Sequence, residues 1–193
     1  MEVKAVTMLK KELKTHYLVA LIWLTIISLL RLVGPGWSLV SLIFFWLGGL
    51  VGTFLFDVDH LVYTLLIYPG EPTSLKVREL FRQGHWRQGL TILVETYKER
   101  IRLPFHNALF QIVFWVFCFW VLTSTNSWLG RGLVMSMALH LLKDELHLLL
   151  VGRDEQLHRW LWWLLRQPVS LGQQRFFVIL MLLIFLGLNL FLI

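Results

Sequence analysis

The sequence predicts an all-helical membrane protein, folded as one bundle of about five transmembrane helices with further amphipathic helices on the membrane surface. Of its 193 residues, 57% are hydrophobic and only 16% are charged, whereas an ordinary soluble domain has about 25% charged residues. Runs of about 20 mostly apolar residues, long enough to cross a bilayer, recur along the chain. Ten tryptophans fit the same setting, because tryptophan collects at membrane–water interfaces. We therefore expect a single transmembrane domain over residues 1–193.

Five apolar segments are expected to be membrane spans. The first follows a basic tail and meets a Gly-Pro-Gly turn, with no small-x-small cleavage site, so we interpret it as a retained span rather than a signal peptide. The second ends at the charged tetrapeptide Asp57-Val58-Asp59-His60. The remaining three occupy the second half of the sequence. The predicted bounds are residues 17–33, 37–56, 105–125, 128–151 and 176–193.

The basic residues gather in alternate connections between these spans. Most of the 18 Lys and Arg lie in the N-terminal tail, between the second and third spans, or between the fourth and fifth, whereas the opposite side has only Arg31 and Arg131. Cytoplasmic loops are enriched in Lys and Arg, which places the N-terminus in the cytoplasm and the C-terminus outside. The net charge of +6 then reflects topology. Nucleic-acid binding is not expected, because no recognised binding motif accompanies the charge.

Two cytoplasmic segments mix apolar and charged residues, as helices lying on a membrane surface do. They are residues 74–102 and residues 155–171, and Pro168 ends the apolar part of the second. Simple adhesion to the membrane explains both segments. The alternative is that they shape a lateral entrance for a lipid.

Ionisable side chains lie at the ends of the first three spans and inside the fourth, where the bilayer makes them costly and hence functional candidates. All of them fall near the cytoplasmic ends, so we expect them to converge in one leaflet. Lys143 and Glu145 lie on other helix faces and are expected to meet lipid head groups or the cytoplasm. The candidate metal ligands are His16, Asp57, Asp59, His60, His106, His140, Asp144 and His147.

These residue types favour a divalent metal centre. Nitrogen and oxygen donors without thiolate suit zinc, manganese, iron or magnesium, and the single cysteine, Cys118, is expected to be a packing residue. The donors suffice for one or two ions, and two-metal sites commonly hydrolyse phosphate esters. Arg102, four residues before His106, could bind a phosphate oxygen. Its alternative interpretation is an ordinary cytoplasmic arginine.

Four short motifs resemble, in order, those of the YdjM-like membrane-bound metal-dependent hydrolases. Phe56-Asp57-Val58-Asp59-His60 is similar to the family's Asp-x-Asp-His element, and Arg102-Leu103-Pro104-Phe105-His106-Asn107 to its His-Arg-x-x-Thr-His-Ser element. Ala138-Leu139-His140-Leu141-Leu142-Lys143-Asp144 resembles the Ser-His-x-x-x-Asp element. His16 matches a histidine near the start of family members.

The resemblance implies a metal-dependent hydrolase in a bacterial inner (plasma) membrane. It implies one or two divalent ions, with zinc or manganese favoured. Asp59 and His106 would manage protons, and Arg102 would hold a phosphate. The implied metal ligands are His16, Asp57, Asp59, His60, His106, His140 and Asp144. The chain departs from the family at Ile101, where the first histidine of the second element is expected, and at Phe56, which replaces a proline.

Three functions remain open on sequence alone. The first is a hydrolase acting on a phosphate-containing amphiphile, a phospholipid or an isoprenoid phosphate, in the cytoplasmic leaflet. The second is a non-enzymatic protein with a structural or vestigial metal site, favoured by Ile101 and by the apolar fifth span, which could contact a membrane-protein partner. The third is an ion transporter, which the apolar outer halves of the spans disfavour.

Overall fold

The protein is all-helical in a computed structural model, which describes residues 2–32 and 38–193 apart from the side chains of residues 2–13 and of Lys98. Helix makes up 78% of the structure, and its described residues include no strand. The longer helices are α1 (Glu2–Leu32), α2 (Leu39–Leu55), α6 (Ala108–Ser124), α7 (Trp128–Leu150) and α9 (Leu171–Asn189). The shorter elements are α3 (Val58–Val62), the π-helical turn η1 (Tyr63–Ile67), α4 (Pro72–Arg82), α5 (Trp86–Glu95), the 3-10 turn η2 (Tyr97–Glu99) and α8 (Asp154–Leu161).

Three helical stretches are long and apolar enough to cross a membrane. They are Lys14–Leu32 within α1, Leu39–Ile67 from α2 to η1, and Leu171–Asn189, which is α9. The second stretch runs past the predicted end at residue 56, since only Phe56 and Asp57 interrupt the helix before α3 begins. The Gly-Pro-Gly turn expected after the first span lies outside the described residues.

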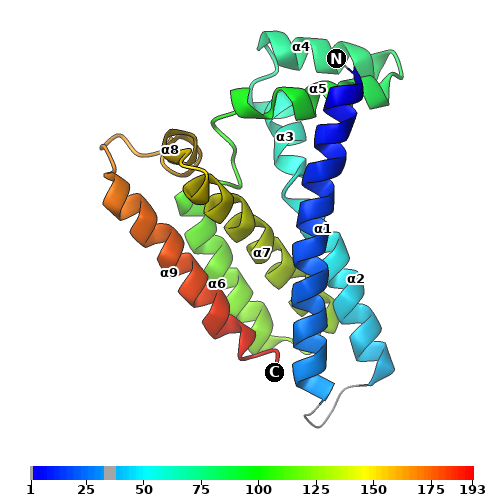
Figure 1. The fold of residues 1–193 in the computed structure, drawn as a ribbon, viewed down its shortest axis with the longest axis vertical. Coiled ribbons are helices and arrows are strands. Elements are labelled where there is room, and N and C mark those ends of the chain that lie inside the picture. The colour runs from blue at the N-terminus through cyan, green and yellow to red at the C-terminus, as the bar shows by residue number, and fades with distance from the viewer. Residues whose placement is uncertain (1, 33–37) are drawn as a thin grey trace.

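The long helices form a bundle (Figure 1), and one end is polar because charged residues of α4, α5 and α8, such as Arg78, Arg87 and Arg159, lie there. Helix α7 contacts α1, α2, α6 and α9, so it is the central element. Helices α3, α4, α5 and α8 gather at the end where α1 begins, and the C-terminus lies at the other end. The predicted surface segments therefore form helices, α4 and α5 in the first and α8 in the second.

Small residues let α2 and α7 touch backbone to backbone. A Cβ added at Gly48 would lie 2.0 Å from the Leu129 carbonyl oxygen, and one at Gly52 would lie 2.3 Å from that of Leu133. Gly132 of α7 faces the backbone of α2 equally closely. Transmembrane helices commonly associate in this way, because lipid supplies no hydrophobic drive and close van der Waals packing must replace it.

The surface helices hold the polar end together through tryptophan. Trp160 of α8 is buried and donates a hydrogen bond from Nε1 to the Arg100 carbonyl oxygen at 3.2 Å, and Trp163 does the same to Leu103 at 3.2 Å. These tryptophans thus anchor the loop before α6. On α4 and α5, Phe81 stacks on Trp86 with ring centroids 4.6 Å apart.

We predict that Gly52→Ala lowers the stability of the protein, because its Cβ has no space beside the α7 backbone. Forced overpacking costs about 1–3 kcal/mol, which should lower the thermal midpoint in detergent by several degrees. The matched control is Gly187→Ala in α9, where an added Cβ meets nothing within 4 Å. Tryptophan fluorescence during heating measures both, and equal midpoints for the two variants would contradict the prediction.

Candidate metal centre

The seven predicted ligands come from four parts of the chain and meet at the polar end of the bundle. Helix α1 contributes the first, the start of α3 with the residue before it contributes three, the loop before α6 contributes one, and α7 contributes two. Each has a contact with another member of the group. In chain order they are His16, Asp57, Asp59, His60, His106, His140 and Asp144.

The Asp144 carboxylate lies in the middle of this group and faces three of its histidines. Its Oδ1 lies 2.9 Å from His16 Nε2. Its Oδ2 lies 3.3 Å from His140 Nε2 and 3.9 Å from His106 Nε2. One carboxylate therefore faces three imidazoles, and the most distant of them in sequence, His16, lies 128 residues from Asp144.

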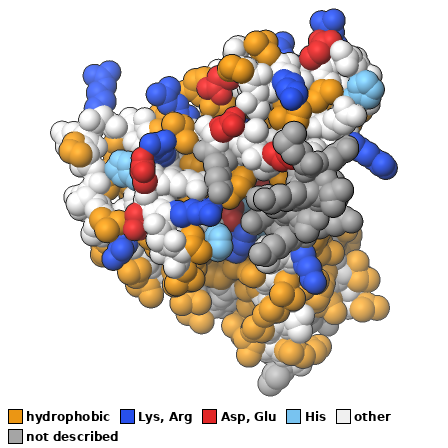
Figure 2. All heavy atoms as spheres, turned by 45° about the horizontal axis from the view of Figure 1, so that its top comes forward, with side chains coloured by type: hydrophobic (Ala, Val, Ile, Leu, Met, Phe, Trp, Pro, Cys, Tyr) orange, Lys and Arg blue, Asp and Glu red, His pale blue; other side chains and the backbone are white. Residues whose placement is uncertain are grey.

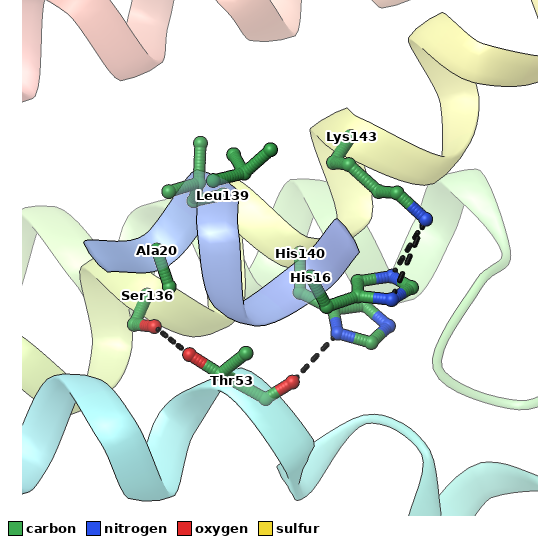
Figure 3. A pocket seen from close by; sticks show the side chains of 8 residues that line it. His16, Ala20, Thr53, Ser136, Leu139, His140 and Lys143 are labelled. Atoms are coloured by element: carbon green, nitrogen blue, oxygen red, sulfur yellow. Dashed lines mark hydrogen bonds between the residues drawn. The ribbon is translucent and has the colours of Figure 1, made fainter. Parts of the chain in front are cut away.

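His140 is held in the form that a metal ligand requires. Its Nδ1 lies 2.7 Å from the Thr53 carbonyl oxygen, which can only accept a hydrogen bond, so Nδ1 carries the proton. The lone pair then belongs to Nε2, which is buried and has no hydrogen-bond partner among the described residues. Metal-binding histidines almost always donate their second N–H in this way. In Figure 3 the His140 ring lies between Thr53 and His16, on which it stacks at a centroid distance of 4.3 Å.

His106 is oriented in the same manner by a carboxylate. Its Nδ1 lies 2.8 Å from Asp59 Oδ2, which also accepts the Phe105 N–H at 3.0 Å. Asp59 is fully buried, so its charge depends on these two donors. In the neutral ring this donation leaves the lone pair on Nε2, which lies 3.9 Å from Asp144 Oδ2. Asp59, predicted as both ligand and catalytic residue, is placed to orient His106, while its Oδ1 has no hydrogen-bond partner among the described residues.

The donor set fits a divalent metal ion. Ligand atoms of His16, His140 and Asp144 all lie within 4.8 Å of one another. Donors about 2.0–2.2 Å from a zinc ion lie roughly 3–4 Å from each other, so these three residues would hold an ion after a small inward shift and the withdrawal of Lys143 Nζ, which lies 3.1 Å from His16 Nε2 and 3.0 Å from Asp144 Oδ1. Asp57 Oδ1 is 3.8 Å from His140 Nε2, and its side chain is 43% exposed. This carboxylate marks the open side of the centre.

Arg100 is a site residue that the sequence analysis missed. It is 2% exposed and donates from Nε to His60 Nδ1 at 3.0 Å, from one terminal nitrogen to Thr96 Oγ1 at 3.0 Å, and from the other to the Leu93 carbonyl. Burial lowers the pKa of Arg100 to about 10, so it stays protonated at neutral pH. In the sequence, nothing distinguished Arg100 from the other arginines of the predicted cytoplasmic segments.

Arg102, the predicted phosphate ligand, is exposed and lies against Tyr68. Its guanidinium donates to the Tyr68 hydroxyl at 3.1 Å and lies 5.8 Å from the centre of that ring. The structure thus places Arg100 beside the histidine–aspartate group and Arg102 on the surface. Alternation along an extended stretch puts residues 100 and 102 on one side in principle, so spacing gave no signal to tell them apart.

Two further α7 residues differ from the expectation. Lys143, expected to reach lipid head groups, has its Nζ 3.1 Å from His16 Nε2 and 3.0 Å from Asp144 Oδ1, as Figure 3 shows for His16. Glu145 is buried and accepts a hydrogen bond from Gln111 of α6. The prediction was wrong for both residues because it considered only one face of α7 as buried, whereas other helices surround α7.

A cavity of about 400 Å³ opens beside the centre. Its polar end is formed by members of the metal-ligand group, together with the exposed His147. Arg153 and Tyr97 also line it, and the Arg153 guanidinium donates to the Tyr97 hydroxyl at 3.3 Å. The remaining wall is apolar and comes from the α2–α3 segment, α5, α7 and α8, with Phe54, Val58, Leu61, Leu90, Leu93, Val94, Leu148 and Trp160.

The chain has no significant match among known protein families, curated proteins or solved structures. The likeness to the YdjM-like hydrolases therefore rests on the four motifs alone.

We predict that His140→Ala lowers the affinity for zinc or manganese by more than about 100-fold, because removing only a residue that orients a ligand already costs about 10–100-fold. Competition with a chelating dye measures the affinity of detergent-purified protein. His85→Ala is the matched control, since His85 is exposed on the turn between α4 and α5. Equal metal affinity of the two variants would exclude His140 as a ligand.

Proposed function

We propose that the protein is a membrane-embedded, metal-dependent hydrolase that cleaves a phosphate ester in an amphiphilic substrate. One observation carries this proposal: the histidine–aspartate group forms the polar end of a cavity that is otherwise apolar. The motif resemblance to the YdjM-like hydrolases supports the same reaction class.

The size and walls of the cavity support an amphiphile as substrate. A volume of about 400 Å³ falls in the range of about 300–1,000 Å³ that is usual for small-molecule sites. Helix α5 forms part of the wall with Leu90, Leu93 and Val94, and Leu90 is 44% exposed. A hydrocarbon chain could lie along α5 while its head group meets the centre. This is the lateral entrance considered from the sequence.

The chain's own residues have separate tasks in this reaction. A bound divalent metal ion, zinc or manganese, would activate water and polarise a phosphoryl oxygen. The Thr53 carbonyl and Asp59 orient His140 and His106, respectively, so that both present Nε2 to the centre. Asp57, which lines the cavity and is the more exposed carboxylate, is the better-placed proton acceptor. Arg153 replaces Arg102 as the cationic side chain on the cavity wall.

We also propose that α6 and α7 cross the membrane with the three longer apolar stretches, giving five crossings and a cytoplasmic N-terminus in the plasma membrane. The two chain ends lie at opposite ends of the bundle (Figure 1). Figure 2 shows Lys and Arg mixed with Asp and Glu over the end that comes forward in that view, and dense hydrophobic side chains below it. At the other end, Arg31 donates to the Leu192 carbonyl at 2.8 Å and Arg131 donates to that of Thr125 at 2.8 Å.

We predict metal-dependent release of phosphate from lysophosphatidic acid by purified wild type, with little or none from Asp144→Asn, which lacks the central charge. Phosphate is measured colorimetrically after chelation and readdition of zinc or manganese. Leu90→Trp should slow turnover by filling the cavity, whereas Leu75→Trp, at a similarly exposed leucine of α4, should not. Wild type that binds metal but releases no phosphate from this or other phospholipids would favour the structural metal site.

The topology predicts opposite labelling of two connections. In a Cys118→Ala background, an impermeant maleimide added to intact spheroplasts should label Asn126→Cys, between α6 and α7, but not Gln167→Cys, between α8 and α9. Both positions are exposed. Labelling of Gln167→Cys alone would reverse the orientation, and equal labelling of both would remove α7 from the set of crossings.

A further inference from the structure

His60 differs from the other two oriented histidines in the kind of partner on its Nδ1. His140 Nδ1 faces a carbonyl oxygen and His106 Nδ1 faces a carboxylate, both of which accept hydrogen bonds. His60 Nδ1 instead lies 3.0 Å from Nε of Arg100. A guanidinium only donates, so this imidazole nitrogen must be the acceptor.

The chemistry of imidazole then decides what His60 can do. A neutral ring has one donor and one acceptor nitrogen, so an acceptor Nδ1 leaves the proton on Nε2. A metal ion needs a lone pair there, which the ring in this form does not offer. His140 and His106 have the reverse arrangement, with the proton on Nδ1 and the lone pair on Nε2.

Arg100 is firmly held in this role. Its other two nitrogens donate to Thr96 Oγ1 and to the Leu93 carbonyl, and its side chain is 2% exposed. The hydrogen bond from Arg100 is the one hydrogen bond of the His60 side chain among the described residues. His60 also lines the cavity, so its N–H is available to a ligand there.

We propose that His60 is not a metal ligand but a substrate-binding residue, fixed by Arg100 so that its Nε2–H donates a hydrogen bond to the anionic head group of an amphiphile in the cavity. Arg100 is then a positioning residue. This inference rests on the proposed function and names the chemistry of the head group, an oxyanion such as a phosphate. It also removes His60 from the seven ligands that the motif resemblance implies.

Zinc affinity separates a ligand from a substrate-binding residue. Competition with a chelating dye should give His60→Phe the zinc affinity of wild type within about 3-fold, whereas His140→Phe, the matched change at the centre, should lose more than about 100-fold. An equal loss in the two variants would overturn the proposal, because His60 would then be a ligand.

Head-group binding tests the positive part of the proposal. The probes are hexadecylphosphonate, whose P–C bond resists hydrolysis, and hexadecanol, which has the same chain without the anion. In zinc-loaded protein, His60→Phe should weaken phosphonate binding by about 10-fold or more, as expected for a hydrogen bond to a charged group, and leave hexadecanol binding unchanged. Unchanged phosphonate binding, or an equal loss for both probes, would contradict the proposal.

Two variants separate positioning from folding. His60→Gln keeps an N–H donor and should retain most of the phosphonate affinity. Arg100→Met should weaken phosphonate binding as His60→Phe does, and the double variant should lose no more than either single variant, since the two residues act as one unit. Additive losses would mean that Arg100 acts independently of His60. If wild type takes up no zinc, the metal centre fails, and the two probes on that protein still decide the role of His60.

Discussion

Helices α2 and α7 approach so closely that no side chain separates their backbones, and the polar end of the molecule depends on that approach. Gly48, Gly52 and Gly132 make it possible. Directly after Gly52, Thr53 Oγ1 lies 2.8 Å from Ser136 Oγ, and the Thr53 carbonyl receives the hydrogen bond of His140. A wider spacing between the helices would leave the His140 ring without an acceptor, and its protonated nitrogen would no longer be defined. The packing of two helices thus determines which atom is offered to a metal ion.

The centre illustrates how the partner of a histidine decides its chemistry. Three histidines of the same sequence-level group meet a carbonyl, a carboxylate and a guanidinium at Nδ1. In neutral rings the first two partners leave the lone pair on Nε2, and the third leaves the proton on Nε2 of a residue that lines the cavity. Asp144 faces His16, His106 and His140 and supplies negative charge beside those three rings. The proposed cation site and the proposed head-group site are therefore adjacent in one group of residues.

The surface helices complete the site rather than only adhering to a membrane. Trp160 and Trp163 hold the backbone at Arg100 and Leu103, which in turn positions Arg100 against His60 and leads into His106. Helix α5 supplies both the Leu93 carbonyl that receives Arg100 and the apolar wall of the cavity. A ligand that moves α5 would therefore also change the surroundings of His60, because Arg100 contacts both α5 and His60.

The sequence by itself determined that the chain is helical and rich in apolar segments of membrane-spanning length, because composition and run length express solvent preference directly. It also predicted which histidines and aspartates meet. Ionisable residues are costly inside a membrane, and those at the same ends of successive predicted spans can be stabilised by one another. The tertiary structure alone decided their roles. Arg100 rather than Arg102 enters the site, Lys143 and Glu145 turn inward, and Asp59 orients His106, because each depends on which atom of a distant residue lies within about 3 Å. Periodicity describes the face of one helix, whereas hydrogen bonds between helices depend on how several faces are brought together.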